Sequence, residues 1–267
     1  TFQNTGTLNL GNASGDTFTF NGGLTESTSG TVTLAGSIDS SNDVMTFGAI
    51  TLGANTTIDT NASSTTGDIT IGAVTGNNNN LTLDTTGFTG SADHTFTGDI
   101  NLGTGTLNVT GDVVLGANVT VTATPGSGTG ITFNDAINAD NASSNDRTLT
   151  LDTGTGASIS VVGTVGNSQA LAGLTITQSN GTTFSGNVNV NDVNGGGGTI
   201  TITDTENGAD ITFAGSVVAN TLDLAQTGYD LIFNGGGTFT SAVTFDNTGT
   251  LNLGNASGDT FTFNGGV

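Results

Sequence analysis

Three acidic side chains gather around a glycine towards the C-terminal end of the chain. Asp204, Glu206 and Asp210 flank Gly208 in the sequence DTENGAD. Carboxylate oxygens beside a tight glycine turn are the hard ligands that Ca²⁺ prefers in proteins. The spacing is one residue shorter than in an EF-hand loop, and the GGxGxD repeat of calcium-binding β-rolls is missing. These residues predict a weak calcium site, and nothing in the sequence calls for another cofactor.

Two other groupings contain residue types that hydrolytic enzymes use. His94, the only histidine, follows Ser91 and Asp93, but neighbours in sequence do not make a triad and no nucleophile elbow is present. Asp39 and Asp43 offer the pair of carboxylates that glycoside hydrolysis needs, as do the three acids above. Enzymes that cleave polysaccharides also bring aromatic and basic residues to the substrate, whereas this chain has no Trp and a single Tyr. We therefore expect no catalytic site.

The charge of the chain excludes several classes of partner. The formal net charge is −21, and the chain contains one Arg, Arg147, and no Lys. Binding to nucleic acid needs Lys or Arg to displace the counterions of the phosphates, so we expect no nucleic-acid partner. The absence of Cys excludes disulfides and zinc–thiolate sites. No apolar run approaches the ~18 residues of a membrane span, so we expect no membrane insertion in this segment.

The elements that must position these residues are short β-strands. Apolar residues alternate with Thr, Asn or Asp, which places one set on a buried face and the other in water. No stretch shows the 3.6-residue period of a helix. The alternation predicts an all-β chain whose core includes Phe133 and Phe213. Representative apolar pairs are Leu8/Leu10, Phe18/Phe20, Val32/Leu34, Ile69/Ile71, Leu107/Val109, Ile131/Phe133, Leu149/Leu151, Ile200/Ile202, Ile211/Phe213 and Phe261/Phe263.

A strand–turn–strand unit recurs along the chain in drifting copies. The segment ITLGANTTIDT at 50–60 aligns with VVLGANVTVTA at 113–123. Similar units occupy 67–76, 130–138 and 209–218. Their spacing, in irregular multiples of roughly 20 to 30 residues, is the scale of one solenoid coil. We predict a single-stranded parallel β-helix (β-solenoid) of about 10 to 12 coils, stacked about 4.8 Å apart, with outward Thr, Asn and Asp in ladders.

The chain ends by repeating its beginning. Residues 1–23 and 244–266 differ only at Gln3 and Asp246, at a constant offset of 243. We interpret residues 1–243 as one long repeat unit and residues 244–267 as the start of the next unit in a tandem array. The two segments are expected to share one backbone conformation. No amphipathic helix and no Pro- or Lys-rich edge is present to cap the stack, so the solenoid is expected to be uncapped at both ends.

Several of these units resemble the repeats of a known family. DITFAGSVVANTLDLAQTG (210–228), LTLDTTG (81–87) and LAGLTITQSNGTTFSGNV (171–188) are similar to the repeats of filamentous-haemagglutinin-type giant surface proteins of bacteria. The resemblance covers nearly the whole chain, in repeat texture and not in a catalytic motif. It implies a right-handed parallel β-helix that is exported, displayed on the cell surface and used in adhesion.

Together these features predict a structural role. We expect the chain to be a segment of an extracellular fibre or of the shaft of a giant adhesin, with adjacent copies of the same repeat as its partners and cell-surface glycans as possible ligands. One alternative is a module that binds calcium, glycans or ice, since Thr-x-Thr pairs such as 175/177 and 201/203 can order water when stacked. Their irregular spacing speaks against ice. A polysaccharide-degrading enzyme is the less favoured alternative.

Overall fold

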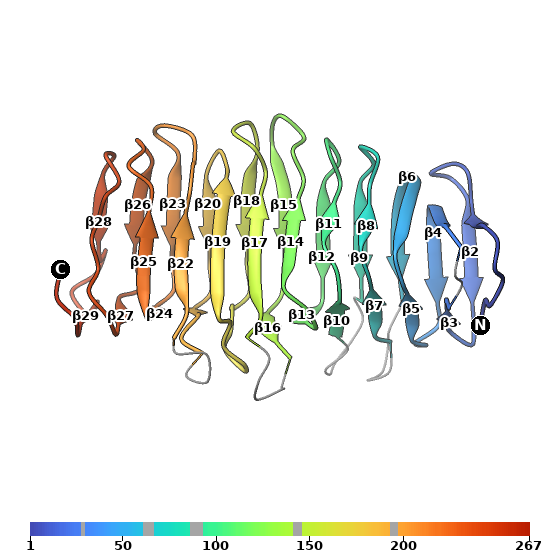
Figure 1. Ribbon diagram of the computed structural model, residues 1–267, viewed down its shortest axis with the longest axis horizontal. Coiled ribbons are helices and arrows are strands. Elements are labelled where there is room, and N and C mark those ends of the chain that lie inside the picture. Colours follow the sequence, from blue (N-terminus) through green and yellow to red (C-terminus); the bar gives the residue numbers. More distant parts are fainter. Residues whose placement is uncertain (28–29, 61–66, 86–92, 141–145, 193–196) are drawn as a thin grey trace.

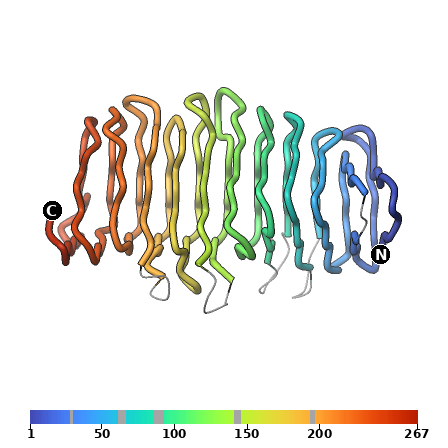
Figure 2. Tube along the Cα trace, in the orientation of Figure 1, coloured from blue at the N-terminus to red at the C-terminus, as the bar shows by residue number. Residues whose placement is uncertain are grey.

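The chain folds into a β-solenoid, as predicted. The computed structural model describes residues 1–27, 30–60, 67–85, 93–140, 146–192 and 197–267, which form about 10 turns of parallel strands and contain no helix. The turns lie side by side along the long axis, with the two termini at opposite ends (Figure 1). The chain trace in Figure 2 shows each turn beside only the turns before and after it.

Each turn contributes strands to two faces that belong to one sheet of 19 strands. The sheet continues around a corner because β4 and β6 each bend from the first face onto the second. The first face contains β1 (Leu8–Leu10), the beginnings of β4 (Val32–Ser40) and β6 (Ile50–Asp59), β8 (Val74–Thr75), β11 (Ile100–Asn101), β14 (Val119–Thr122), β17 (Thr148–Asp152), β19 (Gly173–Gln178), β22 (Thr199–Ile202) and β25 (Thr221–Leu224). The second face contains β2 (Thr17–Phe20), the ends of β4 and β6, β9 (Leu81–Asp84), β12 (Leu107–Thr110), β15 (Thr129–Phe133), β18 (Ser158–Val161), β20 (Thr182–Phe184), β23 (Asp210–Phe213), β26 (Asp230–Phe233) and β28 (Leu251–Leu253).

The third face consists of a six-stranded and a four-stranded sheet. Val165 joins them, because it forms parallel bridges to both Ile137 and Val188. The strands of this face are β3 (Leu24–Thr25), β5 (Met45–Phe47), β7 (Ile69–Ile71), β10 (Asp93–Phe96), β13 (Asp112–Leu115), β16 (Ile137–Ala139), β21 (Val188–Asn189), β24 (Val217–Ala219), β27 (Gly237–Phe239) and β29 (Phe261–Phe263). The described residues therefore form one three-faced stack.

Glycine is needed where the chain turns corners in close contact with the next coil. Gly36 bends β4 with φ of +82°, a conformation that side chains disfavour. A column of glycines lies at another corner, where a Cβ on Gly186 would collide with the backbone of Gly163 and a Cβ on Gly215 with that of Gly186. These columns account for part of the high glycine content, because adjacent coils approach too closely there for a side chain.

The alternating apolar residues line a continuous core. Phe133 and Phe213 are 1% and 0% exposed, which confirms the predicted register. On the second face, Phe213 stacks on Phe184 at 5.1 Å between ring centroids and on Phe233 at 5.0 Å. Parallel coils place equivalent side chains directly above one another, so identical residues in successive coils form stacks.

Outward residues form the expected ladders. Thr120, Thr150, Thr175 and Thr201 pair in register through β14, β17, β19 and β22. Their spacing in the sequence is irregular because the corners differ in length, yet in the structure they stand in one row. The irregular spacing of the Thr pairs in sequence was therefore a poor guide to their arrangement in space.

The two nearly identical segments share their local conformation, as expected. In the first, Asp16 accepts hydrogen bonds from the backbone N–H groups of Asn12 and Ala13 at 2.8 and 3.1 Å. In the second, Asp259 accepts the equivalent bonds at 2.7 and 2.8 Å. Gly11 and Gly254 have φ of +86° and +82°. The same residues thus build the same turn twice.

Candidate functional site

The three predicted calcium ligands lie on one corner, between β22 and β23. Gly208 turns this corner with φ of +77°, and Asp210 begins β23. The side chain of Asp204 accepts a hydrogen bond from Gln178 Nε2 at 3.0 Å. All three acidic residues are exposed, so their carboxylates face solvent. Within the described residues, no group of three acidic or histidine side chains is arranged to hold a metal ion. Calcium binding at Asp204, Glu206 and Asp210 stays a prediction.

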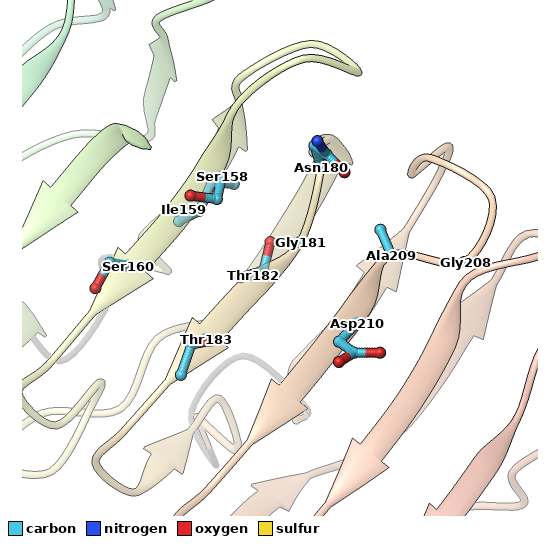
Figure 3. Close-up of a pocket in the computed structure, with 10 residues that line it drawn as sticks. All are labelled: Ser158, Ile159, Ser160, Asn180, Gly181, Thr182, Thr183, Gly208, Ala209 and Asp210. Atoms are coloured by element: carbon cyan, nitrogen blue, oxygen red, sulfur yellow. The ribbon is translucent and has the colours of Figure 1, made fainter. Parts of the chain in front are cut away.

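The same corner forms one wall of a notch on the second face. β19 ends at Gln178 and β20 begins at Thr182, so three residues turn this corner, whereas the corners before and after it use five and seven. The short corner leaves a recess of about 440 Å³ between β18, β20 and β23. Figure 3 shows this notch, which the side chains of Ser158, Ser160, Asn180, Thr183 and Asp210 line.

The notch is lined by polar groups. Its walls carry hydroxyl and amide groups and a single carboxylate, Asp210. Asp210 pairs in register with Asp230 of the next coil, whose carboxylate accepts a hydrogen bond from Thr250 N. Ser158 Oγ donates to the carbonyl oxygen of Gly128 at 3.3 Å. Such groups can hydrogen-bond a neutral sugar, but no aromatic ring among the lining residues offers a stacking platform.

His94 belongs to the core and not to a surface triad. Its ring is fully buried on β10, where Ile69 and Val113 occupy the equivalent positions of the neighbouring coils. Nε2 lies 2.9 Å from the carbonyl oxygen of Thr110, and burial lowers the pKa of the imidazole. Asp93 precedes it on the strand and faces outward, because successive side chains alternate. Ser91 lies outside the described residues. The structure does not bring His94 and Asp93 together.

Asp93 instead belongs to a row of carboxylates on the third face. It pairs in register with Asp112, and its backbone N–H donates to the carboxylate of Asp68 at 3.1 Å. Burial, together with the charges of Asp112 and Asp68, raises the pKa of Asp93 to about 6. The row borders a recess of about 400 Å³ that also includes Asp140, whose carboxylate binds Arg147 at 2.7 Å.

The second face carries another acidic row, which the alternating pattern did not predict. Asp39 pairs with Asp59, and Asp59 pairs with Asp84, in three successive coils. A signal was present, because each follows a buried aliphatic residue and precedes Ser or Thr: Ile38-Asp39-Ser40, Ile58-Asp59-Thr60 and Leu83-Asp84-Thr85. Ser37 Oγ donates to Asp39 at 2.6 Å. Like charges directly opposite each other on neighbouring strands are unfavourable.

Comparison with known proteins assigns this chain to no family. No protein-family model, curated protein or solved structure matches it. None of the described residues forms a helix of the length and apolarity that would cross a membrane. The structure is a β-solenoid that is compatible with a β-helical repeat region.

Proposed function

We propose that this chain is a structural segment of an extracellular fibre or of an adhesin shaft, in which it extends a β-helical rod. One contact carries the proposal. Phe263, which lies in the second copy of the opening segment, stacks on Phe239 of the coil before it at 5.4 Å and an interplanar angle of 7°. The start of one copy therefore packs against the last coil of the copy before it. Repeat proteins form rods through such contacts between neighbouring repeats.

The surface location rests on the resemblance to filamentous-haemagglutinin-type repeats and on composition. A net charge of −21 keeps long rods soluble and apart from one another. Treating intact cells of the source organism with a protease tests the location. Loss of the chain from intact cells supports it, whereas protection in intact cells together with digestion after lysis contradicts it.

A two-copy chain tests the rod itself. In this chain, residues 25–267 follow Val267, so that Val267 takes the place of Leu24. Small-angle X-ray scattering should show a maximum dimension about twice that of the single chain, because each coil adds about 4.8 Å. The Phe263→Asp variant of the two-copy chain is the control for the junction, and it should lose the regular doubling. A two-copy chain that is no longer than one copy would contradict the rod.

The notch supports a second candidate function, the binding of a neutral glycan. Its hydroxyl-rich lining and the single carboxylate of Asp210 are the observations that favour it. Glycan-array binding that Thr183→Val abolishes would support this function, and Thr175→Val on the first face is the matched control.

Isothermal titration with Ca²⁺, with Asp204→Asn as the variant, tests the calcium prediction. Thermal hysteresis near the freezing point tests the ice-binding alternative.

A further inference from the structure

The two nearly identical segments lie on different faces of the solenoid. On the first face, Leu8 and Leu10 pair with Val32 and Leu34. Their counterparts 243 residues later, Leu251 and Leu253, belong to β28 and pair with Leu231 and Phe233 on the second face. Equal sequence has therefore not led to equal position in the coil.

The aromatic strand of each segment shows the same displacement. Phe18 and Phe20 lie in β2 on the second face, where they pair with Ile38 and Ser40. Phe261 and Phe263 lie in β29 on the third face, where they pair with Gly237 and Phe239. The rings nevertheless keep their mutual arrangement. Phe2 meets Phe20 edge-on at 6.1 Å and 89°, and Phe245 meets Phe263 at 6.0 Å and 87°.

The strand pairings fix the size of this displacement. The second face runs through unbroken parallel pairings from β2 to β28, and β28 lies ten coils beyond β2. The counterpart of β28 in the first segment is β1, which lies one face before β2 in the same coil. An offset of 243 residues therefore spans ten coils and one additional face.

A second pair of units shows that this fold permits such a displacement. In the segment at 50–60, Ile50 and Leu52 lie on the first face and the chain turns at Gly53 onto the second. In the matching segment at 113–123, Val113 and Leu115 lie on the third face and the chain turns at Gly116 onto the first. The unit encodes a strand, a corner and a strand, and any corner of the solenoid accepts it, because all three faces bury alternate residues.

We infer that, where copies of this sequence follow one another, each copy is turned by one face relative to the copy before it. The edge of the first coil, formed by β1, β2 and the partly buried Phe2, then receives the coil of residues 222–243 from the preceding copy. The C-terminal coil displays this contact directly, because residues 244–266 sit on that coil. The inference rests on the proposed rod and adds its internal geometry.

The turn has a consequence for anything that binds the rod. The notch on the second face of one copy would lie on the third face of the next copy and on the first face of the one after. A feature present once per copy therefore points in three directions in succession, and it returns to the same face only at every third copy. Such a rod presents its binding surface on all sides, whereas a copy length of whole coils would place every notch in one line.

Engineered disulfides test the turn, because the chain contains no other cysteine. Thr238 and Thr262 are outward neighbours in register on the third face, at a strand spacing that allows a disulfide. The double variant Thr238→Cys/Thr262→Cys should oxidise in most molecules. Ile232→Cys/Thr262→Cys and Asn234→Cys/Thr262→Cys report the alternative, in which the second segment occupies the second face as the first segment does. These two variants should stay reduced.

The pair Thr25→Cys/Thr46→Cys, which is also in register on the third face, is the control for oxidation. Oxidation of the Ile232 or Asn234 variant in place of the Thr238 variant would contradict the displacement by one face. So would a reduced Thr238 variant in a protein whose control pair oxidises. The two-copy chain separates this result from the fate of the rod. A doubled length together with the alternative disulfide would support the rod but contradict the one-face displacement between copies. An undoubled length would contradict the rod itself.

Discussion

The Nε2 atom of His94 lies 2.9 Å from the carbonyl oxygen of Thr110, inside the core of the solenoid. A carbonyl oxygen can only accept, so Nε2 carries the proton and Nδ1 is left as an acceptor. Nδ1 is buried and has no hydrogen-bond partner among the described residues. Burial is the largest effect and lowers the pKa of the imidazole, although the hydrogen bond to Thr110 and the carboxylates of Asp84, Asp135 and Asp112 favour the charged ring.

This arrangement predicts an acid-sensitive core. Because the folded state holds His94 neutral while the unfolded chain binds a proton below about pH 6.5, its contribution to stability falls as pH falls through that value. Relative to His94→Leu, the protein should therefore lose unfolding free energy between pH 7.5 and pH 5.5, as measured by urea denaturation. His94→Gln, which keeps a donor for Thr110, is the control for the hydrogen bond. A difference that is independent of pH would contradict the buried neutral imidazole.

Asp93 should show the opposite dependence. Its pKa of about 6 in the folded state exceeds the ordinary value of 3.8, so the folded state binds the proton more tightly. Its destabilising effect is absent at pH below about 4 and complete above about pH 6. Asp93→Asn should raise the unfolding free energy by about 1 kcal/mol at pH 7.5 and by little at pH 4. The exposed Asp223→Asn serves as the control, and an equal gain at both pH values would refute the explanation.

Tyr229 offers a test of buried polar cost. It is fully buried, its hydroxyl has no hydrogen-bond partner among the described residues, and burial with the charges of Asp246 and Asp223 raises its pKa. Tyr229→Phe should raise the unfolding free energy by about 1 kcal/mol, since an unsatisfied group is removed. Tyr229→Leu should lower it, because the core loses volume. A clear loss in Tyr229→Phe would instead point to a bound water at the hydroxyl.

The phenylalanine stack should be sensitive to charge. Phe213 lies between Phe184 and Phe233 at about 5 Å on either side. Phe213→Asp should cost several kcal/mol, because it buries an unpaired charge. Phe213→Leu, which keeps an apolar side chain, should cost far less. Thermal unfolding followed by circular dichroism measures both changes, and a tolerated Asp would mean that the position is exposed.

We also expect no hydrolytic activity. The structure leaves His94 in the core. Asp39 lies on the second face and Asp204 on the corner between β22 and β23, and among the described residues neither of them is paired with a basic side chain. The purified chain should show no turnover on a panel of glycans and peptides, assayed by mass spectrometry. Reproducible cleavage that Asp39→Asn or Asp204→Asn abolishes would replace the structural role by an enzymatic one.

Period-two alternation was enough to predict the fold class and most of the core. Burial of one side of each strand leaves little freedom of register, since a slip of one residue would expose every apolar side chain. Phe133, Phe213, Leu149 and Leu151 are buried for this reason. The aspartate that follows the aliphatic residue in Ile58-Asp59 and Leu83-Asp84 was also readable as a motif. The notch was not, because it depends on the lengths of three neighbouring corners.

The amino-acid sequence by itself determined the strands through period-two alternation, and it determined the repeated turn because its hydrogen bonds join residues three or four apart, such as Asp16 with Asn12 and Ala13. The tertiary structure alone decided which face each unit occupies. Leu10 and Leu253 have the same neighbours in sequence, yet one lies on the first face and the other on the second. The face depends on the summed lengths of all the coils in between, a quantity to which no local pattern responds. All three faces bury alternate residues alike, so local sequence expresses no preference among them.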